Sequence, residues 1–206
     1  MKRLIEENNN SALEYDEIFK ERQFKKVDSY DAKRWNLLAK YFKRGKLIDL
    51  GCLDSLIPIM MKIKYPSAEV YGLDQTKEAI EFLQSEYPMV SYLVGDLYQT
   101  GFPKEYFDYV ILGEVIEHLE DPEEAIKEAM RILKPGGILT LSTPLNEEIE
   151  FGAVDGIHHL WSFEMKDVKR MLRDYGKVKV TTIGSTYFPK YEYHFPVIIA
   201  WCKKHD

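Results

Sequence analysis

The stretch KLIDLGCLDS, residues 46–55, decides the fold. Its apolar start, LIDL, predicts a buried strand, and Gly51 marks a tight turn after it. Ser55, which precedes the apolar run LIPIMMKI, is typical of the start of a helix. A strand, a glycine turn and a helix form the unit with which α/β proteins hold a nucleotide-like ligand against a helix N-terminus. The residues of this turn are therefore the first candidates for a binding site.

The alternation of strand and helix continues after this unit. Short apolar runs predict further strands, and amphipathic spacing predicts helices between them. The expected strands cover residues 69–73, 90–94, 107–112 and 138–143, and the expected helices cover residues 76–86 and 122–133. Such alternation predicts an α/β, doubly wound fold with a mostly parallel sheet and helices on both faces.

The segments on either side of this core have a different character. Apolar residues recur at helical spacing within residues 32–42, which predicts an amphipathic helix packed on the core. After the core we expect a long loop at 145–161, a helix that ends at Gly176, and a hairpin at one sheet edge built from 177–183 and 196–202. The expected organisation is a single domain over residues 1–206, with an N-terminal helical cap at 1–45, a ligand-binding core at 46–144, and a substrate loop, helix and C-terminal hairpin at 145–206.

Composition narrows the classes of function. The 206 residues carry a formal net charge of -6, which argues against tight binding of duplex nucleic acid through its phosphates. The longest late apolar run, VIIAWC, is too short to cross a bilayer. Cys52 and Cys202 fit neither a disulfide framework nor a paired zinc motif. These features predict a cytoplasmic protein with no membrane insertion.

Polar residues and glycines follow the predicted strands at the points where the strands end. Because the carboxyl ends of parallel strands meet at one edge of a sheet, we expect these residues to line one crevice. Asp74 follows Gly51 at about the interval at which an acid binds ribose hydroxyls, and Asp96 is placed to accept from an adenine amino group. The strand-end residues are Asp49, Gly51, Asp74, Asp96, Gly113 and Glu114.

The turn argues against a dinucleotide as the ligand. The dinucleotide fingerprint needs a second glycine where this chain has Leu53, and the acids at the strand ends would repel a diphosphate. A ribosylated adenine that carries a cationic group suits these residues better. S-adenosylmethionine, which has a sulfonium and an ammonium group and no phosphate, is such a molecule.

Five stretches together resemble the successive motifs of class I S-adenosylmethionine-dependent methyltransferases. They are LIDLGCLDS, VYGLDQ, VGDLYQTGFP, FDYVILGEVIEHLEDP and RILKPGGILTLSTP, and they are most similar to the small-molecule group that includes quinone-biosynthesis and sugar methyltransferases. The likeness runs from about Lys46 to Pro144, and HHLWSFEMKDVKRMLRDYG resembles the next helix of that group with the histidine-containing loop before it. The resemblance implies a Rossmann-like, seven-stranded sheet whose last strand is antiparallel.

The resemblance also implies contacts with S-adenosylmethionine. It assigns Gly51 and Cys52 to the methionine part, Asp74 to the ribose, and Asp96 with Leu97 to the adenine. The sequence departs from the family at Leu53 and Ser55, where relatives usually have glycine. The expected cofactor-binding residues are Asp49, Gly51, Cys52, Leu53, Asp74, Gln75, Asp96, Leu97 and Gly113.

Methyl transfer needs alignment of the two reactants, and it needs a base only where the acceptor holds a proton. His118 and Glu114, directly beyond the fourth strand, are the expected catalytic residues, with packing or capping as the alternative for His118. His158, His159 and Trp161 are the expected substrate contacts, although Trp161 could instead pin the loop. The predicted function is methyl transfer to an oxygen, nitrogen or carbon atom of a small molecule.

Two alternative functions stay open. Leu53 and Ser55 would suit a non-catalytic protein that retains the fold to bind a cofactor or a partner. The Glu-x-x-Glu-His arrangement of Glu114, Glu117 and His118 is similar to the metal-binding motif of small-RNA 2'-O-methyltransferases. The acidic balance of the chain argues against RNA, so no residue is assigned to a metal. The aromatic residues from Tyr187 to Phe195 could line a substrate pocket or pair with a second subunit.

Overall fold

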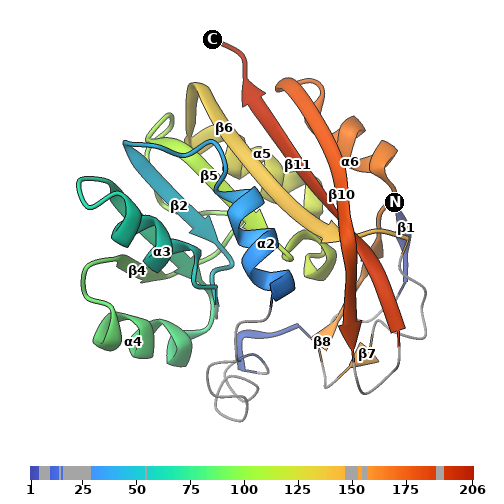
Figure 1. Ribbon diagram of the computed structural model, residues 1–206, viewed down its shortest axis with the longest axis horizontal. Helices are drawn as coiled ribbons and strands as arrows, with labels where there is room; N and C mark the ends of the chain where they lie inside the picture. The colour runs from blue at the N-terminus through green and yellow to red at the C-terminus, as the bar shows by residue number, and fades with distance from the viewer. Residues whose placement is uncertain are drawn as a thin grey trace.

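Figure 1 shows the computed structural model, which describes residues 1–4, 10–13, 15, 29–53, 55–146, 153–154, 157–188 and 193–206. Within these residues, seven strands form one sheet, and only β11 runs antiparallel to its two neighbours. This arrangement confirms the mostly parallel, seven-stranded sheet with an antiparallel last strand. In spatial order the strands are β10 (Gly176–Phe188), β11 (Tyr193–Lys204), β6 (Leu133–Pro144), β5 (Phe107–Gly113), β2 (Lys46–Leu50), β3 (Glu69–Asp74) and β4 (Ser91–Val94).

Helices cover both faces of the sheet, as the alternating sequence predicts (Figure 1). Successive residues of β2 point to opposite faces, so Leu47 packs in one apolar core and Ile48 in the other. The core around Leu47 includes residues of α2 (Ser29–Leu38), α3 (Ile57–Lys64) and α4 (Lys77–Glu86). The core around Ile48 includes residues of α5 (Pro122–Ile132) and α6 (Met165–Leu172). None of the described helices is both long and apolar enough to cross a lipid bilayer.

Helix α2, which confirms the expected amphipathic helix, is fixed to the sheet by two side-chain hydrogen bonds. The buried hydroxyl of Tyr109 donates to the carbonyl of Leu38 at 2.6 Å, and the indole N–H of Trp201 donates to the carbonyl of Leu37 at 3.0 Å. Both bonds reach carbonyls at the C-terminal end of the helix, and the Leu37 carbonyl also accepts from the Lys40 amide at 3.3 Å. They hold α2 against β5 and β11, and so fix the position of every other side chain on this helix.

Several boundaries differ from the sequence prediction. Helix α2 ends at Leu38 and not at residue 42, and α6 ends at Leu172, before the expected end at Gly176. Helix α3 begins at Ile57, two residues after the expected cap, and the Ser55 hydroxyl accepts from the Ile57 amide at 3.3 Å. Strand β6 begins at Leu133 and not at residue 138, because Leu133 already pairs with Phe107 of β5. The KPGG segment that we expected to separate helix from strand is therefore an irregularity within β6.

The segment at 145–161 is not a plain loop. Short antiparallel pairs join β7 (Ala153–Val154) to β8 (Ile157–His158), and β9 (Trp161–Ser162) to β1 (Lys2–Arg3) at the N-terminus. No periodicity marks two-residue strands in a sequence, which is why the prediction missed them. The expected C-terminal hairpin is confirmed by β10 and β11, while residues 189–192 of its connection lie outside the described part of the chain.

Candidate active site

The predicted strand-end residues lie together at one edge of the sheet. Asp49 of β2 pairs in register with Gly72 of β3, and the Gly51 amide donates to the Leu73 carbonyl at 2.7 Å. The Gly95 amide, which follows β4, donates to the carbonyl of Asp74 at 2.9 Å. The carboxyl ends of β2, β3 and β4 are thus joined by backbone hydrogen bonds beyond the sheet.

The turn after β2 requires glycine at one position. Gly51 has a φ angle of 74°, and a Cβ atom there would lie 2.6 Å from Cγ2 of Val115. Among the described residues of this turn, Gly51 alone has a positive φ angle. Leu53 and Ser55 therefore occupy conformations that any L-residue adopts. Their departure from the family pattern causes no strain in the backbone.

Asp74 holds this turn through its carboxylate. Its Oδ2 accepts from the Leu53 amide and its Oδ1 from the Thr76 amide, each at 2.9 Å, and the residue is 7% exposed. A carboxylate has about four acceptor sites, so each oxygen can also accept from a ribose hydroxyl. The sequence did not reveal this structural role of Asp74, and its expected contact with the ribose stays a prediction.

The other expected adenosine contacts lie on more exposed positions. Gln75 is exposed, and its side-chain amide donates to the carbonyl of Asn10 at 3.4 Å. Asp96 is exposed, and its Oδ1 accepts from the amide of Tyr98 at 2.8 Å. Leu97 is half-buried and packs against the apolar core. Asp96 and Leu97 follow directly after β4, at the same edge as Asp74.

Asp49 is a buried carboxyl group whose Oδ2 has no hydrogen-bond partner among the described residues. Burial raises the pKa of Asp49 to about 7, and the nearby charge of Asp74 acts in the same direction. A hydrogen bond from Ser55 and the charge of Arg34 act against this rise. A cationic ligand group would supply the missing partner, and this observation fits the ammonium group of S-adenosylmethionine.

Glu114, which we expected to be catalytic, forms an ion pair. Its Oε1 lies 3.4 Å from Nη1 of Arg34 on α2, and Arg34 also binds Asp31 at 3.1 Å. Glu114 has a φ angle of 56°, a left-handed conformation that is unusual for a residue other than glycine. The carboxylate of Glu114 is therefore directed toward α2. The carboxylate that lies beside His118 is that of Glu117.

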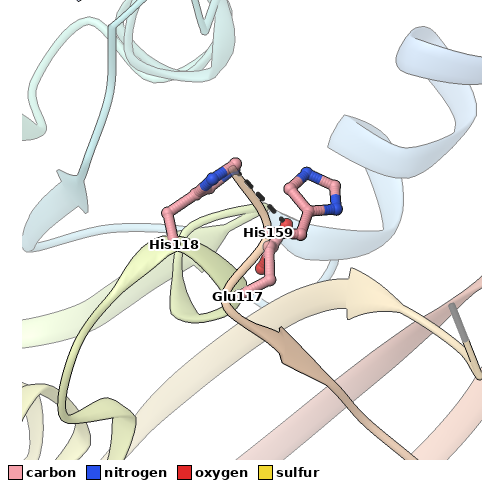
Figure 2. Close-up of side chains that lie close together, drawn as sticks. All are labelled: Glu117, His118 and His159. Atoms are coloured by element: carbon pink, nitrogen blue, oxygen red, sulfur yellow. Dashed lines mark ion pairs between the residues drawn. The ribbon is translucent and has the colours of Figure 1, made fainter. Parts of the chain in front are cut away.

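Figure 2 shows how Glu117 and His118 meet His159. Glu117 and His118 belong to the short helix η1 (Ile116–His118), whereas His159 comes from the segment between β8 and β9. The ring centroids of His118 and His159 are 4.5 Å apart at an interplanar angle of 75°. Oε1 of Glu117 lies 4.0 Å from Nε2 of His118. One donor atom from each of the three side chains lies within 4.8 Å of the other two.

Glu117 is the buried member of this group. It is 0% exposed, and its Oε2 accepts from the hydroxyl of Thr143 at 3.0 Å. Its Oε1 has no hydrogen-bond partner among the described residues. Burial, together with the charge of Glu114 and against the effect of His159, raises the pKa of Glu117 to about 8. The i,i+3 spacing of the two glutamates was visible in the sequence, but which of them lies beside the histidines was not.

Hydrogen bonds fix the two segments that carry these side chains. The Leu160 amide donates to the Glu117 carbonyl at 2.6 Å, and the indole N–H of Trp161 donates to the Leu119 carbonyl at 2.8 Å. The guanidinium of Arg3 lies 4.9 Å above the Trp161 ring. These contacts anchor the segment through Trp161, which was the alternative to the expected contact of Trp161 with a substrate. The side chain of His158 lies outside the described part of the chain.

Comparison with known proteins agrees with this geometry. Residues 48–141 match a family model described as a methyltransferase domain. Over these residues the chain is similar to S-adenosylmethionine-dependent methyltransferases. The buried oxygen of Asp49 that lacks a hydrogen-bond partner would suit the positive charge of such a cofactor.

The chain has relatives of several kinds. The chain is 31% identical over 132 residues to an uncharacterized methyltransferase of Schizosaccharomyces pombe, covering 54% of this chain and 48% of that protein. It is 29% identical over 140 residues to the demethylmenaquinone methyltransferase of Chlorobaculum tepidum, covering 68% and 55%. The matched part of the chain spans half or less of the length of the most similar curated relatives.

A solved structure shows the same fold over almost the whole chain. Phosphoethanolamine N-methyltransferase 2 of Haemonchus contortus, in complex with S-adenosyl-L-methionine, superposes with a TM-score of 0.70 at 14% identity. The superposition covers 97% of this chain and 58% of that protein. At this identity the likeness concerns the fold alone, so the roles of the site residues follow from the geometry of this chain.

Proposed function

We propose that this chain transfers the methyl group of S-adenosylmethionine to an oxygen, nitrogen or carbon atom of a small-molecule acceptor. The observation that carries this proposal is the placement of two kinds of residue at one sheet edge. Buried carboxyls suited to a charged adenosine lie at the ends of β2 and β3, and His118, which follows β5, packs against His159. Since β2 lies between β3 and β5, the two sets border the same crevice.

The acids at the strand ends would bind the cofactor, which when bound supplies an electrophilic methyl carbon. Asp49, with its unpartnered Oδ2, would bind the ammonium group. Asp74 would accept from the ribose hydroxyls while it keeps its two bonds to backbone amides. Asp96 and Leu97 would contact the adenine, and the backbones of Gly51 and Gly113 would border the methionine part.

The acceptor would bind against His118 and His159. Either imidazole can take a proton from an acceptor hydroxyl or ammonium group near neutral pH. Tyr15 lies beside this pair, with its ring centroid 6.3 Å from that of His118. Arg34 on α2 closes the side next to Asp49 and Glu114.

The two alternative functions gain no comparable support. The case for a non-catalytic protein rested on Leu53 and Ser55, and neither residue strains the turn. A net charge of -6 still argues against RNA as the acceptor. Both cysteines are free thiols, in line with the prediction of a cytoplasmic location, which stays a prediction.

The test is transfer of label from methyl-tritiated S-adenosylmethionine to separated fractions of a cell extract. We expect label in the small-molecule fraction with the wild-type chain and at least tenfold less with His118→Ala. His205→Ala is the matched control, because His205 is an exposed histidine near the C-terminus and is not part of the His118–His159 pair. Label in RNA or protein, or none in any fraction, would refute the proposal.

A further inference from the structure

Among the described residues, one group of three histidine, cysteine or acidic side chains has its donor atoms within 4.8 Å of one another. The group consists of Glu117, His118 and His159 (Figure 2). We propose that it binds a divalent first-row transition metal, with Zn²⁺ as the expected occupant. From the sequence we assigned no metal ligand, because the acidic balance of the chain argues against the RNA enzymes whose metal-binding motif Glu114, Glu117 and His118 resemble.

The spacing of the donor atoms suits a small cation. Zn²⁺ binds imidazole nitrogen and carboxylate oxygen at roughly 2.0–2.2 Å, which places the donors of a tetrahedral site about 3.4 Å apart. Oε1 of Glu117 and Nε2 of His118 are already 4.0 Å apart, and the largest separation in the group is within 4.8 Å. Rotations of the side chains that bring the donor atoms about 1 Å closer together would therefore complete the site. The backbone would not need to move.

An independent observation indicates a cation at this place. Glu117 is 0% exposed, yet its Oε1, the oxygen nearer His118, has no hydrogen-bond partner among the described residues. Burial of such an oxygen is costly unless a charge or a donor compensates it. Its other oxygen, Oε2, accepts from Thr143 at 3.0 Å, which fixes the carboxylate as hydrogen bonds do for the ligands of known metal sites. A metal ion bound to Oε1 of Glu117 would supply the partner that this oxygen lacks.

The donor set distinguishes between metals. Mg²⁺ and Ca²⁺ prefer oxygen ligands, whereas two imidazoles and one carboxylate suit Zn²⁺ and Fe²⁺. Glu114 would supply the additional oxygen that a harder cation needs, but its carboxylate is paired with Arg34 at 3.4 Å. Three protein ligands leave one coordination position open, as in catalytic zinc sites.

The open position gives the metal a role in acceptor binding, and this step rests on the proposed function. An acceptor that offers a hydroxyl or carboxylate oxygen would bind the metal at the position that the protein leaves free. A bound metal would lower the pKa of a coordinated hydroxyl, whose proton would pass to solvent water, so the two imidazoles would act as ligands and not as the base. The oxygen would then bond to the methyl carbon as the carbon–sulfur bond breaks, and S-adenosylhomocysteine would leave. The inference therefore narrows the acceptor to an oxygen-containing small molecule.

The test begins with the metal alone, on the full chain freed of metal by chelation and without cofactor or acceptor. We expect one Zn²⁺ per chain by titration calorimetry, with Mg²⁺ bound at least 100-fold more weakly. X-ray absorption at the zinc edge of the wild-type chain should show two imidazole ligands and oxygen. This measurement needs no variant, so it decides the ligand set even if a variant fails to fold. A shell made only of oxygen, or one that contains sulfur, would overturn the proposal.

Variants then assign the ligands. Glu117→Gln and His159→Ala should each weaken Zn²⁺ binding roughly 100-fold, and Thr143→Val about 10- to 100-fold, because Thr143 orients the carboxylate. His205→Ala should leave the affinity unchanged. Equal Zn²⁺ affinity in all four variants and the wild type would contradict the site. Binding of S-adenosylmethionine to the metal-free chain is measured separately, so a chain that binds cofactor but no metal refutes this inference and leaves the proposed function standing.

Discussion

Replacement of Gly51 by alanine tests whether the turn after β2 is as tightly constrained as its geometry indicates. At a φ angle of 74°, an L-residue pays about 1–2 kcal/mol for the left-handed conformation. The new Cβ would also lie 2.6 Å from Cγ2 and 3.2 Å from Cγ1 of the buried Val115, and overpacking of a core costs about 1–3 kcal/mol. Alanine restricts the unfolded chain, which offsets these costs by roughly 0.4–1 kcal/mol.

The free energy of unfolding of Gly51→Ala should therefore fall by about 2–4 kcal/mol, as measured by urea denaturation. Gly101→Ala is a matched control, because Gly101 has a φ angle of 75° and a Cβ atom there would meet nothing within 4 Å. The control should lose only about 1 kcal/mol, from backbone strain alone. It should also bind S-adenosylmethionine as the wild type does, whereas Gly51→Ala should bind it more weakly. Equal losses of stability in the two variants would refute the close contact with Val115.

Three further substitutions test other parts of the account. Burial raises the pKa of Asp49 to about 7, whereas the same carboxyl group in the unfolded chain ionises near pH ~4. Between these two pH values the folded carboxyl keeps its proton and the unfolded one loses it, so the stability of the wild type falls as the pH rises. Asp49→Asn should therefore gain stability relative to wild type between urea titrations at pH 5 and pH 8, and a constant difference would contradict this. Asp74→Asn should lose about 1.5–3 kcal/mol, because its charged oxygens hold the amides of Leu53 and Thr76, and a loss below ~0.5 kcal/mol in thermal unfolding would count against that role. Tyr109→Phe should cost about 1–3 kcal/mol and speed amide hydrogen exchange in α2 but not in α4, and equal rates in both helices would exclude its part in holding α2.

The elements of the fold were predictable because their signals are local. Each strand of the parallel core is an apolar run that ends at an acid or a glycine, and each helix has a regular apolar face, so β2 and α4 match their predicted positions almost to the residue. The two-residue strands β1 and β9 were not predictable, because their pairing joins residues that are distant in sequence. The extent of β6 was missed for the same reason, since the pairing of Leu133 with Phe107 is a long-range contact.

For the candidate site, the positions of residues at strand ends were predictable from the sequence, whereas the directions of their side chains were not. The positions of Asp49 and Asp74 follow from the rule that parallel strands end at one edge, so their convergence needed no structure. The choice between Glu114 and Glu117 depends on the direction of two side chains, one toward Arg34 and the other toward the histidines. No sequence pattern indicated these directions, nor the left-handed backbone of Glu114.

The most direct test of the central claim is a calorimetric titration of S-adenosylmethionine into the wild-type chain, since every assignment at the sheet edge depends on this molecule. The account predicts saturable binding of one molecule per chain with a dissociation constant in the micromolar range, on the order of -8 kcal/mol. Absence of any heat of binding at millimolar S-adenosylmethionine, with a folded chain, would contradict it.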